Sequence, residues 1–434
     1  MPQDLRTGRL RRARVGTPGS PGDQPLACGG KFVFAHRVST RNLPAVWQSL
    51  WSRLDALPQR RARQAGLGIW ALIGVIVFTI VAIDPMGRSA TKEYQEASTR
   101  WWNSETLYKG KNKYLYLPQA AMIYTPFNLL PKRVGEPLWR MVCLGTLAGA
   151  LALAARHLAP GKAATVFLVA TVVMLPSALS SARNGQVNMP LAGLYLLTAL
   201  ALARNRWHLA AIILALALAL KPISIVPILL CGALYPRLIL PLALWLAVMF
   251  GAAFLHHDPQ FVAGQYQAFF DKLTNSAAKP TGHTWCDFAG MLRSFGLSLP
   301  DSVLFLIRAG AAAATFGLCV LALRTKDALR RALTILLFAA IYLMLFNPRT
   351  ETNSYIILGV FVGLLAAYDG LVRKAPGLAL AWILLAIALG AENLGPIHQW
   401  TNLWLKALVT LVLGIWLSRK VLQSRNGEPA VFPN

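Results

Sequence analysis

Twelve apolar segments of 14 to 22 residues recur along this chain, and they constrain its fold more than any other feature. Lipid offers the backbone no hydrogen-bond partner, so a segment that crosses it has to be helical. A hydrocarbon core of about 30 Å takes about 20 residues of helix. The sequence therefore predicts an all-α, polytopic membrane protein with about 12 transmembrane helices. The apolar segments are residues 65–83, 137–155, 163–180, 187–203, 207–220, 222–236, 238–255, 302–323, 332–346, 354–372, 376–391 and 402–418.

Two neighbouring segments, residues 207–220 and 222–236, are short for a complete crossing. They predict either two spans or a broken, re-entrant pair. Lys221 separates them, directly before a proline.

The charge of the chain is unevenly distributed. Charged residues make up only 14% of it, against about 25% in soluble domains, which excludes an ordinary cytosolic enzyme. The formal net charge is nevertheless +26. On the predicted topology, the side that holds the N-terminal leader has a net charge of +20 and the other side +6. The positive-inside rule then places both termini in the cytoplasm, at a cytoplasmic (inner) membrane. The charge thus sets topology and contact with membrane lipids, and no nucleic acid is expected as a partner.

The chain divides into three predicted parts. Residues 1–64 form a basic cytoplasmic leader that is largely disordered, residues 65–420 form the transmembrane domain, and residues 421–434 form a cytoplasmic tail. The two long loops, 84–136 and 256–301, face outward on this topology.

The first outer loop contains two stretches that resemble short helices. Residues 90–103 end in aromatic side chains, and the apolar stretch 118–130 is too short to span a bilayer. The first predicts a helix that lies in the membrane interface, and the second predicts a re-entrant or an interfacial helix. The polar clusters of the chain gather on this outer face, whereas a pore or carrier would place them at mid-depth on several helices.

Acidic residues of the first outer loop are the first candidates for catalysis. Asp84 and Glu93 lie where the chain leaves the membrane and could serve as a general base. The alternative is that they cap helices or are simply solvated. Tyr94 follows directly and is a candidate for substrate contact.

A polar turn joins the predicted helices 163–180 and 187–203. Its side chains include Arg183, Asn184, Gln186 and Asn188, in a place where an apolar connection would cost less. A cation and free N–H groups at the start of a helix attract an oxyanion such as phosphate. The alternative is a helix cap with amide bonds between helices. Lys221 either holds a phosphate in the same way or extends its amine to the interface.

A second polar turn, residues 347–355, holds Arg349, Glu351 and Asn353. It predicts a phosphate or sugar contact, with Glu351 as a second candidate base; a surface ion pair between Arg349 and Glu351 is the alternative. In the second outer loop, His283 is a weaker candidate for contact with a sugar or isoprenoid. No metal site is predicted.

Motifs for nucleotide binding are absent from the sequence: there is no GxxxxGK[ST] loop and no GxGxxG after a strand. The chemistry therefore requires no cofactor and uses a donor that is already in the membrane.

The chain resembles glycosyltransferase family 87 in the order of these motifs. This family comprises the polytopic alpha-mannosyltransferase-like proteins of the GT-C superfamily. The resemblance runs from the acid-bearing first loop with Tyr94 and Tyr108, through Tyr114-Leu-Tyr-Leu-Pro118, to the polar turns described above. It implies a GT-C-like fold, a polyprenyl-phosphate-linked sugar as donor, and an active site that faces outward. Family members often carry an aspartate, the presumed base, four residues before the tyrosine that matches Tyr94. Ala90 stands there in this chain.

The resulting hypothesis is an inverting, metal-independent hexosyltransferase that moves a mannose-like sugar to a lipid or glycan acceptor in the cell envelope. Arg183, Lys221 and Arg349 would neutralise the leaving phosphate, and Gln186, Asn188 and Asn353 would bind sugar hydroxyls. The base would be Glu93 or Asp84, with Glu351 as the other choice. A flippase or carrier of lipid-linked saccharides is one alternative, and a surface-glycan ligase or polymerase is another.

Overall fold

A computed structural model describes residues 44–87, 89–108, 114–277, 285–424 and 431–432 of the chain. Every regular element within these ranges is an α-helix or a 3-10 helix, which confirms the predicted all-α class. His283 lies outside the described residues, as does most of the predicted leader.

Seven helical segments in the described part are long and apolar enough to cross a membrane. They contain α2 (Gln59–Ile83), α5 (Lys132–Leu158), α6 (Ala163–Asn184), α10 (Ile239–Ala252), α13 (Asp301–Ala322), α14 (Ala328–Phe346) and α15 (Ile356–Leu371). Four shorter apolar helices accompany them: α7 (Asn188–Ala203), α8 (Trp207–Leu220), α9 (Ile225–Leu234) and α16 (Pro376–Leu389). The last predicted segment is α18 (Leu405–Gln423). All twelve predicted segments are therefore helices, and the protein is a polytopic membrane protein.

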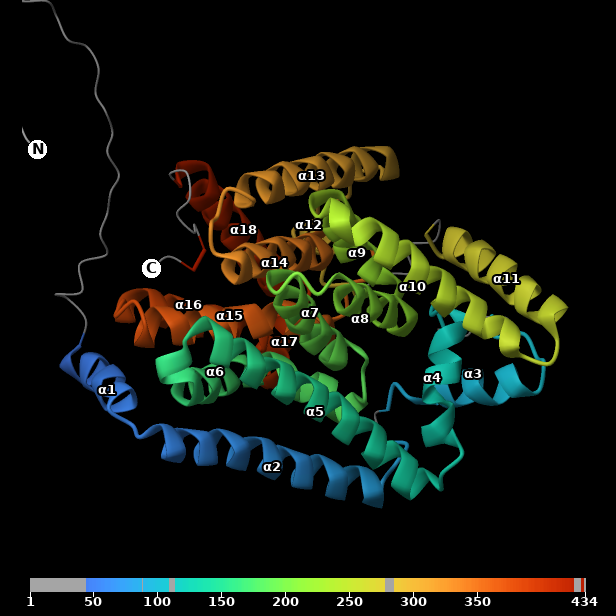
Figure 1. Cartoon of the computed structure of the whole chain (residues 1–434), viewed down its shortest axis with the longest axis horizontal. Coiled ribbons are helices and arrows are strands. Elements are labelled where there is room, and N and C mark those ends of the chain that lie inside the picture. The colour runs from blue at the N-terminus through green and yellow to red at the C-terminus, as the bar shows by residue number, and fades with distance from the viewer. Residues whose placement is uncertain (1–43, 88, 109–113, 278–284, 425–430, 433–434) are drawn as a thin grey trace, which may run out of the picture. The chain divides into compact units, whose positions relative to one another are not determined.

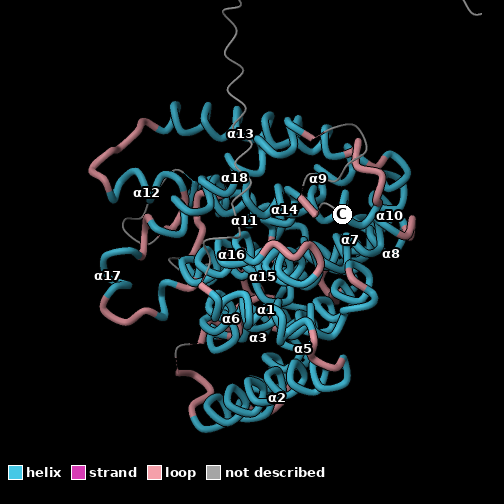
Figure 2. Tube along the Cα trace, turned by 90° about the vertical axis from the view of Figure 1, so that its left-hand side faces the viewer, coloured by secondary structure: helices cyan, strands magenta, loops and turns pink. Residues whose placement is uncertain are grey.

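Helix α15 forms the centre of the bundle. All of its apolar window is buried, whereas only 22% of that of α2 and 11% of that of α13 is buried. Figure 2 shows α15 in the middle, with α2 and α13 at opposite edges. Glycine allows α15 to approach α6 closely, because a Cβ at Gly363 would lie 2.6 Å from the carbonyl oxygen of Ala170. The lipid-facing helices thus surround a core helix that lipid does not reach.

Three helices from the two long loops gather at one end of the bundle, which we call the loop end. They are α3 (Lys92–Trp102), α4 (Pro118–Asn128) and α11 (Pro259–Ala277), and Figure 1 shows them opposite the end that carries α1. Helices α3 and α4 correspond to the two short helices predicted for the first outer loop. Two further short helices, α12 (Phe288–Ser294) and α17 (Ile397–Thr401), lie in the later loops of the chain.

Helix α1 (Ala45–Asp55) closes the other end of the bundle. The indole of Trp51 packs against Gly370 of α15, and Trp47 donates from Nε1 to the carbonyl of Pro376, 2.8 Å away. Asp55 forms ion pairs with Lys162 and Lys374. The hydrogen bond from Lys162 is the main reason that the pKa of Asp55 lies below its usual value. A carboxylate of α1 thus pairs with lysines from two other segments at this end of the bundle.

Candidate functional site

Side chains from three distant parts of the chain meet at the loop end in what we call the polar cluster: Gln186, Asn188, Lys221, Glu351 and Asn353. Lys221 donates from Nζ to Oδ1 of Asn188 at 2.8 Å, and Asn188 donates from Nδ2 to Oδ1 of Asn353 at 3.0 Å. Gln186 donates from Nε2 to Oε2 of Glu351 at 3.3 Å. One cation, one carboxylate and three amides thus form two hydrogen-bonded sets, which share the turn of Gln186 and Asn188 and the turn of Glu351 and Asn353.

The local sequence explains how the first part reaches the cluster. Helix α6 ends at Asn184 because Gly185 takes the left-handed conformation, with φ of 68°, which glycine adopts without strain. The chain then turns, and α7 begins at Asn188. Gln186 and Asn188 are both buried, with 8% and 0% exposure. An amide at 0% exposure requires partners, and Asn188 finds them in Lys221, Asn353 and Ser354.

The other two parts come from breaks between helices. Lys221 follows α8 in an extended conformation, and Pro222 begins the short 3-10 helix Pro222–Ser224. This is the break predicted for the short apolar pair, and it frees the lysine side chain to point at Asn188. Glu351 and Asn353 lie in the turn between α14 and α15, where Thr352–Tyr355 form another 3-10 turn.

Two tyrosines adjoin the polar cluster. The hydroxyls of Tyr94 on α3 and Tyr116 are 3.0 Å apart, and their rings meet edge to face. Burial is the main cause that raises the pKa of both phenols, and the negative charge of Glu351 raises both further. Glu351 therefore lies near both tyrosines, which stay protonated and present hydrogen-bond donors beside the cluster.

Two further cations, Arg349 and Lys272, lie outside the polar cluster. The guanidinium of Arg349 stacks over the ring of Trp285, 5.7 Å from its centre. Burial and then the charge of Arg349 lower the pKa of Lys272 on α11, while Glu93 opposes that effect. Arg349 and Glu93 thus both lie close enough to Lys272 to act on it electrostatically, in opposite directions. The sequence analysis missed Lys272 because nothing around it in α11 distinguishes it from a solvated lysine.

The remaining predicted residues take other places. Asp84 is exposed at the end of α2, and the side chain of Arg183 is also exposed. The backbone carbonyls of Arg183 and Asn184 are bonded to Arg140 and to the N–H of Ala90. Arg183 and Asn184 therefore contribute backbone contacts to the turn that precedes Gln186, and Glu93 is the half-buried acid of α3.

Glu136 and Arg140 of α5 form a buried ion pair that the sequence did not predict. Each side chain is 1% exposed. A signal was available, because two opposite charges four residues apart at the start of an apolar run are costly unless they are paired.

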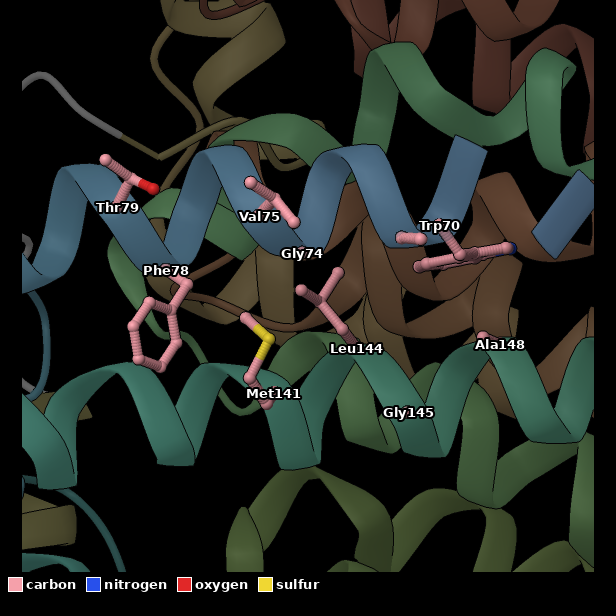
Figure 3. A pocket seen from close by; sticks show the side chains of 10 residues that line it. Trp70, Gly74, Val75, Phe78, Thr79, Met141, Leu144, Gly145 and Ala148 are labelled. Atoms are coloured by element: carbon pink, nitrogen blue, oxygen red, sulfur yellow. The ribbon is translucent and has the colours of Figure 1, made fainter. Parts of the chain in front are cut away.

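An apolar groove runs between α2 and α5 (Figure 3). It has a volume of about 530 Å³, and its lining carries no charged side chain. Phe78 and Met141 face each other across it, close to the ends of the two helices that lead to the loop end, and Trp70 lies further along. The small residues Gly74, Gly145 and Ala148 leave the space open.

The described residues hold no group of three His, Cys, Asp or Glu side chains that could bind a metal ion. His256, in the second long loop, instead packs on Trp101, whose backbone carbonyl lies 2.9 Å from its Nε2.

Comparison with models of known protein families identifies a match. The model of glycosyltransferase family 87 matches residues 114–348, more than half of the chain. The match includes Gln186, Asn188 and Lys221 of the polar cluster and ends at residue 348, three residues before Glu351. No curated protein matches the chain.

Proposed function

The chain belongs to glycosyltransferase family 87 and is therefore a membrane glycosyltransferase, and on that premise we propose that it moves a mannose-like hexose from a polyprenyl-phosphate donor to a lipid or glycan acceptor. The observation that carries this proposal is the polar cluster. A lysine, a glutamate and three amides from residues 186–188, 221 and 351–353 converge at one end of a membrane bundle. These groups can form hydrogen bonds with sugar hydroxyls and neutralise a phosphate ester.

Glu351 is the base that the geometry favours. Of the three candidate acids, it alone is hydrogen-bonded to a member of the cluster, and it lies beside Tyr94 and Tyr116. Its carboxylate would take the proton of the acceptor hydroxyl as that oxygen forms a bond to the anomeric carbon. The bond between the anomeric carbon and the phosphate oxygen breaks, and its electron pair leaves with the prenyl phosphate. A single displacement of this kind inverts the anomeric configuration.

Cations would neutralise the leaving phosphate in place of a metal. Lys221 is fixed by Asn188 inside the cluster, and Arg349 lies two residues from Glu351. Lys272 adds a third positive charge beside Arg349. Preorganised charges of this kind stabilise a developing anion without reorganisation at the moment of reaction.

The prenyl tail requires an apolar surface that is open to lipid. The groove between α2 and α5 offers one, because it is lined by apolar and small side chains and runs toward the loop end. The charge distribution of the sequence supports a site on the outer face of the cytoplasmic membrane, since the side that holds the leader has a net charge of +20 on the predicted topology and the other side +6.

Transfer from radiolabelled prenyl-phosphate mannose and prenyl-phosphate glucose, by the chain reconstituted in liposomes containing EDTA, tests the proposal. We expect transfer from one of the two donors, and a loss of at least 100-fold in kcat for Glu351→Gln. Glu96→Gln is the matched control, because Glu96 is an exposed acid of α3 paired with Arg100. Full activity of Glu351→Gln would remove Glu351 as the base. Movement of the donor across the bilayer without transfer would indicate a flippase instead.

A further inference from the structure

The ion pair of Glu136 and Arg140 connects segments that are distant in sequence. The two residues are four positions apart on α5, with Arg140 Nη1 2.5 Å from Glu136 Oε2. Burying two charges costs more than burying apolar side chains of the same size, so such a pair is weak evidence for stability by itself. What distinguishes this pair is the number and the origin of its other partners.

The carboxylate of Glu136 accepts hydrogen bonds from three side chains outside its own helix, two from α3 and the residue before it and one from α4. Thr91, just before α3, donates from Oγ1 to Oε2 at 2.6 Å, and Gln95 of α3 donates from Nε2 to Oε1 at 2.5 Å. Tyr124 of α4 donates to Oε1 at 2.6 Å. Each oxygen therefore faces at least two donors. Glu93 and Tyr94 lie between Thr91 and Gln95 in the sequence. The start of α3 is therefore bonded to α5 by the residues on either side of Glu93 and Tyr94.

The guanidinium of Arg140 holds the other segment. Its Nε donates to the backbone carbonyl of Arg183 at 3.0 Å, and its Nη2 donates to Oγ of Ser89 at 2.9 Å. The neighbouring Trp139 donates from Nε1 to the carbonyl of Gly185 at 2.8 Å. The turn that leads to Gln186 is thus bonded to the same helix face as the start of α3.

The start of α3 and the turn after α6 meet at Arg140, and we call this place the junction. The space around the junction is filled. A Cβ added at Gly185 would lie 2.8 Å from Cγ2 of Thr91 and 3.1 Å from Cζ of Arg140. The N–H of Ala90 donates to the carbonyl of Asn184 at 2.9 Å, which joins the two segments directly. Directional hydrogen bonds in such a packed site fix a geometry that apolar packing alone leaves looser.

We propose that Glu136 and Arg140 are positioning residues that hold Glu93 and Tyr94 on α3 and Gln186 in the turn after α6 in one fixed arrangement around the substrate. The inference rests on the proposed function, because it assigns these segments to the site. Neither residue is assigned contact with substrate. At metal sites, removing the contacts that orient the ligands typically lowers affinity or activity about 10- to 100-fold, and we expect an effect of the same size for this pair.

Two variants separate positioning from folding. In Glu136→Gln, the amide NH₂ replaces one oxygen and faces at least two donors, whichever way the amide turns. Arg140→Lys keeps the charge opposite Glu136, but one amine cannot replace three guanidinium nitrogens. We expect both variants to fold, with kcat lowered about 10- to 100-fold and KM for the donor changed less than about threefold. If Arg140→Lys instead keeps its kcat, only the charge matters and the positioning role is excluded.

Asp369→Asn is the matched control. Asp369 on α15 is 2% exposed and pairs with Arg373 four residues later at 2.8 Å, in the same arrangement as Glu136 and Arg140. It lies at the end of α15 against which α1 packs, away from the loop end. We expect this variant to lose stability and to keep the kcat of the folded protein. An equal fall in kcat for Asp369→Asn would show that the effect is general loss of stability.

Hydrogen exchange in lipid nanodiscs gives a readout that needs no turnover. In Glu136→Gln and Arg140→Lys, the backbone amides of residues 89–95 and 183–188 should exchange faster than in the wild type. In Asp369→Asn, the amides of these same residues should exchange as in the wild type. Unchanged exchange in the first two variants would overturn the proposal. If the wild type transfers no sugar, the proposed function fails, and the exchange result still decides whether the pair orders these segments.

Discussion

Gln186 and Glu351 are 165 positions apart in the sequence, and a hydrogen bond of 3.3 Å between Nε2 and Oε2 joins them. The contact connects the turn after α6 with the turn before α15. Helices α6 and α15 pack closely along their length, because Gly359 and Gly363 face Ser177 and Ala170. The packing of two membrane helices therefore determines that these two polar turns meet.

Lys221 should matter for donor affinity. Its amine is held 2.8 Å from Asn188, and a hydrogen bond to a charged group contributes about 1.5–3 kcal/mol. We expect Lys221→Met to raise the dissociation constant of a prenyl monophosphate about 10- to 100-fold, measured by titration calorimetry in detergent. Lys92→Met, which removes an exposed lysine of α3, serves as the control. Equal affinities for the two variants would exclude Lys221 from the phosphate site.

Donor binding should weaken at alkaline pH. Burial and then the charge of Arg349 lower the pKa of Lys272 below its usual value, and only the protonated amine attracts phosphate. Lys272 is charged below that pKa, so affinity is present at lower pH and is lost as the pH rises through it. A sugar phosphodiester keeps its single charge over this range and is the probe for the titration. Lys272→Arg should remove the pH dependence; an unchanged curve would show that another group titrates.

Gly185→Ala should lower the free energy of unfolding by more than the cost of placing an alanine in the left-handed conformation. A left-handed φ costs an L-residue about 1–2 kcal/mol, and here the new methyl would also meet Thr91 and Arg140. Gly296→Ala is the matched control, because Gly296 has φ of 76° and no neighbouring atom within 4 Å of a Cβ. Thermal unfolding in detergent should show the larger fall for Gly185→Ala. Equal falls would mean that the junction can relax.

Lys406 and Glu392 form another buried ion pair, and it supports the turn that carries Glu351. The amine of Lys406 bonds both Glu392 and the carbonyl of Thr352, the latter at 3.0 Å, and lies 5.4 Å from the ring centre of Tyr355. We expect Lys406→Met to destabilise the protein by about 3–5 kcal/mol, because it leaves a buried carboxylate unpaired. The double variant Lys406→Met/Glu392→Met should recover most of that loss in denaturant unfolding. A double variant as unstable as the single one would contradict this explanation.

The sequence by itself determined the helices. Each of the twelve apolar segments is a helix in the structure, and α3 and α4 were predicted within the first loop, because lipid excludes every other backbone conformation for such segments. The break at Lys221 could also be predicted, since proline follows it and cannot continue a helix. The family could be recognised because its motifs lie in order along the chain.

Only the tertiary structure decided which polar residues meet. The sequence placed Glu93 and Asp84 ahead of Glu351 as candidate bases, and the packing of α6 against α15 is what joins Glu351 to Gln186. Lys272 reaches Arg349 only because α11 lies at the loop end, and Glu136 gains its partners only when α3, α4 and α5 assemble. The physical reason is that hydrophobic periodicity specifies local helix formation, whereas contacts between turns depend on how whole helices pack, which no local pattern encodes.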